Sequence, residues 1–104
     1  MGNLRSEISN TQTAVHRLRQ ELPRLRREYS VVSLGLFGSY VRGEQHEGSD
    51  LDVLVEFSDV PGILKFLDLE RDLSAILGVP VDLVQKEALK PAIGKRIMKE
   101  VLTI

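Results

Sequence analysis

Two short apolar segments most strongly constrain what this chain can fold into. Residues 31–37 (VVSLGLF) are rich in β-branched and aliphatic side chains. In residues 51–57 (LDVLVEF), every second residue from the first is apolar, so that one face is apolar and the opposite face carries Asp52 and Glu56. The first pattern predicts a buried strand, and the second predicts a strand with one face toward the core. A chain of 104 residues has room for one compact core. We therefore expect a single domain over residues 1–104, built on a small sheet.

Three other segments carry apolar residues at helical spacing. The first is interrupted by Pro23, which predicts a kink or a new helix start. The second spans residues 63–77 and is followed by Gly78, and Pro91 opens the third. The residues expected to face inward are Leu4, Ile8, Val15, Leu18, Leu22 and Leu25, then Ile63, Phe66, Leu67, Leu73, Ile76 and Leu77, and finally Ile93, Ile97 and Val101.

A third short strand is expected over residues 79–84, between the second and the last helix. Strands that alternate with helices indicate an α/β domain with a small sheet. The first helix is expected to pack on this sheet, although an exposed apolar stripe there would suit docking to a partner.

Composition excludes several classes of protein. The chain contains no cysteine, so a disulfide framework, a thiolate metal site and a cysteine nucleophile are all excluded. No apolar run approaches the roughly 20 residues that span a bilayer, and the first ten residues lack the apolar core of a signal peptide. We therefore expect a cytoplasmic protein with no membrane partner. Aromatic residues make up 5% and tryptophan is absent, so nucleic acid is not expected as a direct substrate.

Charge is concentrated in the middle of the chain. The formal net charge is only -1, but residues 44–72 hold nine acidic and two basic residues, and the flanking segments are basic. Such a block suits a site that concentrates cations near bases that could bind a polyanion. It also fits solvated helix faces and loops, so the charge pattern alone leaves both interpretations open.

The polar segment that follows residues 31–37 begins with Gly38-Ser39. Gly38 has no Cβ, so the backbone there can approach a ligand closely and adopt unusual dihedral angles. Between a strand and a helix start, the N–H groups of Gly38 and Ser39 could face a phosphate, and the Ser39 hydroxyl adds a donor. Arg42, one turn later, could pair with the phosphate or with an acid that shapes the site. Alone, however, Gly-Ser before a helix is most often an ordinary cap.

Asp50 and Asp52 begin the second apolar strand. Two residues apart on a strand, their carboxylates share one face at about 6.5–7 Å along the strand axis. Side chains at that separation can converge on one divalent ion, or on two ions about 3.5–4 Å apart. Asp82, on the next expected strand, is the candidate third carboxylate, and Mg²⁺ prefers such oxygen ligands. A lone Asp-x-Asp pair usually consists of exposed strand or turn residues without a function. Combined with Gly38-Ser39 at this spacing, however, the pair favours a functional site.

The remaining polar residues receive plainer interpretations. His46 is expected to be an exposed loop residue, and Tyr40 is expected to pack. Lys86, Lys90, Lys95, Arg96 and Lys99 are expected to form the solvated faces of a loop and a helix.

The motif residues resemble a known family. Gly-Ser, Arg-Gly and Ser-Asp-x-Asp at positions 38–52 resemble the defining motif of the DNA polymerase beta nucleotidyltransferase superfamily. More closely, the chain is similar to the minimal nucleotidyltransferases of bacteria and archaea. The likeness includes Leu36–Gly43, Val81–Val84 and a final helix expected over residues 93–104. It implies a nucleotidyltransferase fold, a small mixed β-sheet flanked by helices.

The resemblance also implies roles for the site residues. Gly38 and Ser39 would hold the β- and γ-phosphates of a nucleoside triphosphate, with Arg42 as a further nucleotide-binding candidate; the sequence leaves the base of the donor open. Asp50 and Asp52 would bind Mg²⁺, and Asp82 would be the third carboxylate and help deprotonate the attacking hydroxyl. These three aspartates are thus the candidate catalytic and metal-binding residues.

The activity that the resemblance implies is that of an antitoxin. It would transfer AMP from ATP to a tyrosine hydroxyl of a HEPN-type toxin. One alternative is a binding module that neutralises its partner by occlusion alone. The other is a small-molecule nucleotidyltransferase whose homodimer builds the acceptor pocket. The sequence leaves the oligomeric state, homodimer or hetero-oligomer, open.

Overall fold

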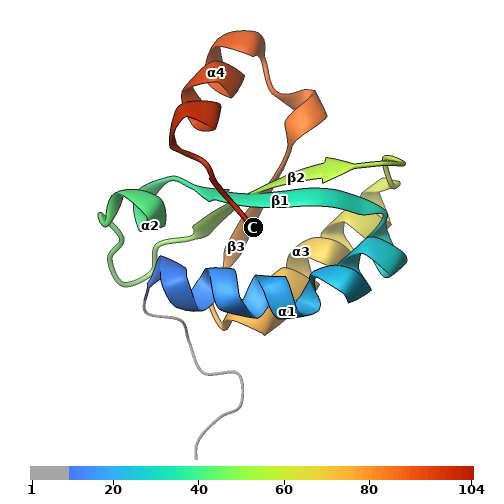
Figure 1. The fold of residues 1–104 in the computed structure, drawn as a ribbon, viewed down its shortest axis with the longest axis horizontal. Coiled ribbons are helices and arrows are strands. Elements are labelled where there is room, and N and C mark those ends of the chain that lie inside the picture. Colours follow the sequence, from blue (N-terminus) through green and yellow to red (C-terminus); the bar gives the residue numbers. More distant parts are fainter. Residues whose placement is uncertain (1–9) are drawn as a thin grey trace, which may run out of the picture.

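A computed structural model describes residues 10–104 of the chain (Figure 1). Its elements, in chain order, are α1 (Thr11–Tyr29), β1 (Val31–Phe37), α2 (Ser39–Arg42), β2 (Leu51–Phe57), α3 (Ile63–Leu77), β3 (Val81–Gln85), the 3₁₀ turn η1 (Lys86–Ala88), α4 (Pro91–Glu100) and β4 (Leu102–Thr103). Among these residues, no helix is both long and apolar enough to cross a membrane.

The strands form one mixed sheet in the order β3-β2-β1-β4. β2 and β3 run parallel, whereas β1 pairs antiparallel with both β2 and β4. Helices α1 and α3 cover one face of the sheet, and α4 arches over the other (Figure 1). The predicted α/β class with a small mixed sheet flanked by helices is therefore confirmed.

The core lies between the sheet and the α1–α3 layer. Leu51, Val53 and Val55 of β2 are fully buried, while Asp52 and Glu56 on the opposite face are not, as the alternation predicts. The stripe of α1 is also buried, at Ala14, Leu18, Leu22 and Leu25. Because this stripe packs within the domain, α1 is not an exposed docking helix. The predicted inward residues Leu4 and Ile8 lie outside the described part of the chain.

Pro23 does not start a new helix, contrary to one of the two predicted outcomes. α1 runs continuously from Thr11 to Tyr29 with Pro23 inside it. The proline removes one helical hydrogen bond, but burial of Leu22 and Leu25 on either side holds the helix against the core.

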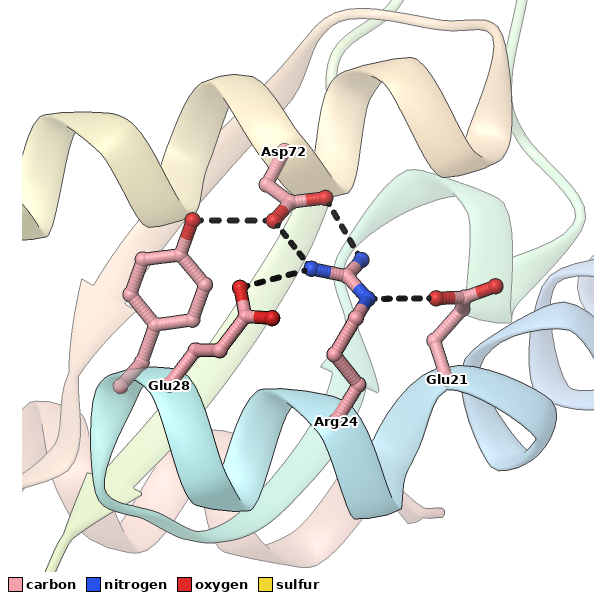
Figure 2. A network of polar contacts seen from close by, with 5 residues as sticks. Glu21, Arg24, Glu28 and Asp72 are labelled. Carbon is pink, nitrogen blue, oxygen red and sulfur yellow. Dashed lines mark hydrogen bonds and ion pairs between the residues drawn. The ribbon is translucent and has the colours of Figure 1, made fainter.

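An ion-pair network also fastens α1 to α3 one residue after the proline (Figure 2). Arg24 donates to both oxygens of Asp72, at 2.8 and 2.9 Å, and the Tyr29 hydroxyl donates to Asp72 at 2.9 Å. Arg24 also contacts Glu21 and Glu28. Hydrogen bonding to Asp72 raises the pKa of Arg24, and burial, followed by the bond to Asp72, raises the pKa of Tyr29 to about 12.

The start of α3 differs from the prediction. Ile63 and Leu67 were expected inside, but their side chains are 70% and 39% exposed. α3 turns Leu69 and Leu73 toward the sheet, and at 3.6 residues per turn Ile63 and Leu67 do not share that face. Phe66 does, and it packs on the core as predicted.

The end of the chain also differs from the prediction. The last helix ends at Glu100, not at residue 104, and Leu102–Thr103 form β4 beside β1. Gly35 of β1 makes this possible, because a Cβ there would collide with the Val101 side chain. No residue of α4 is buried, so the expectation that Ile93 and Ile97 belong to the core is wrong. They face a cleft instead.

Candidate active site

A cleft of about 390 Å³ lies between the end of β1 and helix α4. The sheet side and the α2 loop contribute one wall, and one face of α4 contributes the other. Its lining residues are Phe37, Gly38, Arg42 and Asp52, and from α4 Ile93, Arg96, Ile97 and Glu100. The cleft therefore contains three of the predicted site residues, Gly38, Arg42 and Asp52.

Gly38 is held in a conformation that only glycine adopts readily. Its φ is +83° and its ψ is -155°. Phe37 pairs with Asp52 across β1 and β2, so the next residue, Gly38, lies against the Asp52 carboxylate. A Cβ at Gly38 would overlap a carboxylate oxygen of Asp52. The glycine thus allows the backbone to lie directly against the Asp52 carboxylate.

The Gly38 N–H and Arg42 are already paired with carboxylates. Gly38 N donates to Glu100 Oε2 at 2.7 Å, and Arg42 Nη1 lies 3.2 Å from both Glu100 carboxylate oxygens. Arg42 Nε also donates to Glu44 Oε1 at 2.9 Å. Hydrogen bonds to Glu44 and Glu100 raise the pKa of Arg42. The bond from Gly38, helped by Arg42, lowers the pKa of Glu100.

Asp52 lies at the centre of the acidic side of the cleft. Burial raises its pKa to about 6, with the Asp82 and Asp50 carboxylates as the next contributions. Asp82 pairs in register with Asp52 on the parallel strand β3, and neighbouring strands lie about 4.8 Å apart. Asp52 and Asp82 therefore lie on one face of the sheet, whereas Asp50 precedes the strand. Burial and the neighbouring negative charges thus both disfavour the charged form of Asp52.

The three aspartates differ in position. Asp52 is half-buried on β2, whereas Asp50 lies one residue before the strand and, like Asp82, is exposed. Within residues 10–104, no three acidic or histidine side chains are grouped closely enough to hold a metal ion by themselves. Mg²⁺ usually takes one or two carboxylates and completes its shell with water and substrate phosphates. The carboxylate oxygens and their mutual repulsion thus fit a Mg²⁺ that is shared with a phosphate ligand.

Several other sequence predictions can be compared with the structure. Tyr40 is buried in the core, and His46 is exposed in its loop, as expected. The Ser39 hydroxyl makes no hydrogen bond to any residue between 10 and 104, which leaves it available to a ligand. Arg96 is exposed, as expected, and also lines the cleft.

Glu100 was missed by sequence reasoning. Its only signal is the spacing of Ile93, Arg96, Ile97 and Glu100, which places them on one helical face. That spacing does not reveal what the face meets.

The profile of the nucleotidyltransferase domain family matches residues 16–104. The chain belongs to this family. Among its relatives, the protein adenylyltransferase MntA of Thermococcus cleftensis is 50% identical over 80 residues, covering 77% of this chain and 81% of the relative. The chain is thus a nucleotidyltransferase.

Solved structures agree with this assignment. A structure described as a minimal nucleotidyltransferase is 32% identical with a TM-score of 0.77, and the match covers 92% of this chain and 97% of the other. A toxin–antitoxin crystal structure with AMP-PNP is 25% identical with a TM-score of 0.67, covering 91% of this chain and 72% of the other. The nucleotidyltransferase fold that the sequence predicts is confirmed.

Proposed function

We propose that this nucleotidyltransferase transfers AMP from ATP to a tyrosine hydroxyl of a HEPN-type toxin and so acts as an antitoxin. Support comes from the family, from a relative at 50% identity named as a protein adenylyltransferase, and from the neighbouring toxin–antitoxin structure with AMP-PNP. The HEPN class of partner and the tyrosine acceptor rest on the resemblance to minimal nucleotidyltransferases.

One observation carries the proposal, namely the contact of Gly38 with Asp52. A phosphate-binding backbone N–H and a metal-binding carboxylate must lie within one ion's reach if a metal is to bridge protein and triphosphate. Gly38 and Asp52 meet this requirement, because the Gly38 backbone lies so close to the Asp52 carboxylate that a Cβ at Gly38 would overlap one of its oxygens.

The chain's own residues supply the following functions. The Gly38 N–H, the Ser39 hydroxyl and Arg42 bind phosphate oxygens, and Asp50 and Asp52 would hold Mg²⁺. Bound Mg²⁺ would offset the charge that develops on the triphosphate. Asp82, exposed beside Asp52, accepts the proton of the attacking hydroxyl. The hydroxyl oxygen bonds to the α-phosphorus as the bond to the bridging oxygen breaks, and pyrophosphate leaves.

The size of the cleft favours an acceptor on a separate molecule. Pockets of about 300–1,000 Å³ hold one small ligand, and a cleft of about 390 Å³ is near the lower limit of that range. A nucleotide would fill most of it. The acceptor hydroxyl would then reach the α-phosphate from outside, as a side chain on a docked protein can.

The direct test is transfer of label from ATP. Purified protein, Mg²⁺ and a co-encoded HEPN-type protein are incubated with ATP labelled at the α-phosphate or, as a control, at the γ-phosphate. We expect label on the partner from α-labelled ATP only, and none with the Asp50→Asn/Asp52→Asn double variant. Absence of transfer by the unmodified protein would overturn the proposal.

The same double variant, tested for neutralisation of the toxin in cells, addresses the second candidate, neutralisation by occlusion alone. Exposed apolar side chains give it a structural basis, because a partner could cover Val60 in the loop before α3 and Ile63 and Leu64 at the start of α3. If the double variant still neutralises the toxin at normal expression, occlusion is the mechanism. Transfer to a small molecule instead, by a homodimer, would support the third interpretation.

A further inference from the structure

A carboxylate of the chain itself fills the place that the proposed function reserves for phosphate. Glu100, the last residue of α4, accepts the Gly38 N–H at 2.7 Å and pairs with Arg42 at 3.2 Å. Both donors are the groups that would bind the triphosphate. Glu100, 62 positions after Gly38 in the sequence, thus occupies both donors.

The surroundings of Glu100 are those of an anion-binding subsite. Two cationic side chains face it, Arg42 from α2 and Arg96 from one turn earlier on α4, and both line the cleft. Among residues 10–104, Arg96 forms no ion pair of its own. The pKa of Glu100 lies below its usual range, because the Gly38 N–H and both arginines favour the charged carboxylate. A phosphate oxygen would be favoured by the same groups.

The two anions cannot be accommodated together. Gly38 has one N–H, and a donor that bonds Glu100 at 2.7 Å is not available to a phosphate. Glu100 also contributes to the repulsion that raises the pKa of Asp52. A triphosphate beside it would add further negative charge to the same wall.

We propose that Glu100 occupies the subsite of a terminal phosphate and that nucleotide binding displaces it, so that the chain carries a built-in competitor of its own substrate. The inference rests on the proposed function, since it takes the ligand to be a nucleoside triphosphate. It assigns Arg96 as a further phosphate-binding residue, which comes into use when the Glu100 side chain leaves.

Displacement requires movement of a side chain rather than of the helix. The segment after Glu100 is fixed to the sheet through β4 and through a bond from Ile104 N to Leu34 O at 2.9 Å. Glu100 is partly exposed at the edge of the cleft, so another rotamer can carry its carboxylate into solvent.

The alternative is that Glu100 is a positioning residue that holds Gly38 and Arg42 ready for phosphate. The two roles predict opposite effects of its removal. Without a competitor, nucleotide binds more tightly, whereas without a positioning residue it binds more weakly.

Calorimetric titration with Mg–ATP, and separately with inorganic tripolyphosphate, distinguishes the two. We expect Glu100→Ala to bind both probes about tenfold more tightly than the unmodified protein, since a charge-assisted contact no longer has to be broken. Glu100→Gln should lie between them, because its amide oxygen still accepts from Gly38. Glu87→Gln removes an exposed charge just before α4 without touching the cleft, and should bind like the unmodified protein.

The Gly38 amide signal in a ¹⁵N NMR spectrum reports the displacement directly. It should move in unliganded Glu100→Ala, and in the unmodified protein on addition of tripolyphosphate. The rest of each spectrum shows whether the variant is folded.

Unchanged or weaker binding by a folded Glu100→Ala overturns this inference and leaves the proposed function standing. If neither probe binds to any variant, both fail. If the probes bind as expected but no label is transferred, only the proposed function fails.

Discussion

Asp52 and Asp82 are register partners on the neighbouring parallel strands β2 and β3. Their carboxylates share the sheet face that α4 overhangs, and Asp82 contributes to a pKa of about 6 for Asp52. Burial of Asp52 and its repulsion from Asp82 both disfavour the charged carboxylate. Under the proposed function, a bound Mg²⁺ would offset this cost.

The first prediction concerns the pH dependence of stability. The pKa of Asp52 is higher in the folded state, about 6, than the ordinary value of 3.8. The folded state therefore binds more protons, and stability is lost as the pH rises through this range. Asp52→Asn should raise the unfolding temperature by a few degrees at pH 7.5 without metal. The gain should vanish below about pH 3.8, where the carboxyl group is protonated in both states. A gain independent of pH would contradict this account.

The second prediction concerns Gly38. Gly38→Ala places a Cβ against the Asp52 carboxylate at a backbone φ of +83°. The substitution should lower the free energy of unfolding by roughly 1–3 kcal/mol and should also weaken nucleotide binding. Gly62→Ala is the matched control, because φ there is -70° and no atom lies within 4 Å of the new Cβ. Urea unfolding and nucleotide titration give both quantities. Equal losses in the two variants would be evidence against a special role for Gly38.

The third prediction concerns the α1–α3 network. Asp72→Asn weakens the paired bonds from Arg24 and the bond from Tyr29, and should cost about 1–3 kcal/mol. Asp68→Asn should change stability by less than about 1 kcal/mol, because its pair with Arg71 is exposed. The pKa of Tyr29 is about 12 in the unmodified protein, and an absorbance titration should give a lower value in Asp72→Asn. An unchanged Tyr29 titration would show that Asp72 does not perturb it.

The fourth prediction concerns Mg²⁺ and Asp82. Chelation of divalent ions should abolish transfer, and adding Mg²⁺ back should restore it, because the proposed mechanism needs Mg²⁺ at Asp50 and Asp52. Asp82→Asn should lower kcat at least tenfold while leaving nucleotide binding within about threefold, since a proton acceptor acts in the chemical step. Equal losses in binding and in kcat would instead make Asp82 a nucleotide-binding residue.

The sequence was informative wherever one pattern had one physical solution. The alternation over residues 51–57 can bury only one face, so it located β2 and the exposed side of Asp52. Gly38-Ser39 and Asp50-x-Asp52 indicated a candidate site because the two motifs occur together, at this spacing, between two apolar strands.

The sequence was uninformative where two faces of a helix are both apolar. The amphipathic pattern of residues 63–77 did not tell which side Ile63 and Leu67 would take, because the sheet covers only the face of Leu69 and Leu73. The apolar residues Ile93 and Ile97 of α4 likewise have the spacing of core residues but line the cleft. Glu100 could not be assigned, since its partners Gly38 and Arg42 are distant in sequence. β4 is only two residues long and depends on Gly35.

Intact-mass spectrometry of the partner would show whether this cleft transfers AMP onto another protein. After incubation with Mg–ATP and the unmodified protein, the account predicts a HEPN-type protein heavier by one or more AMP units, located on a tyrosine by peptide mapping. With Asp50→Asn/Asp52→Asn the mass should stay unchanged. An unmodified partner after incubation with the intact protein, or equal modification by the double variant, would contradict the account.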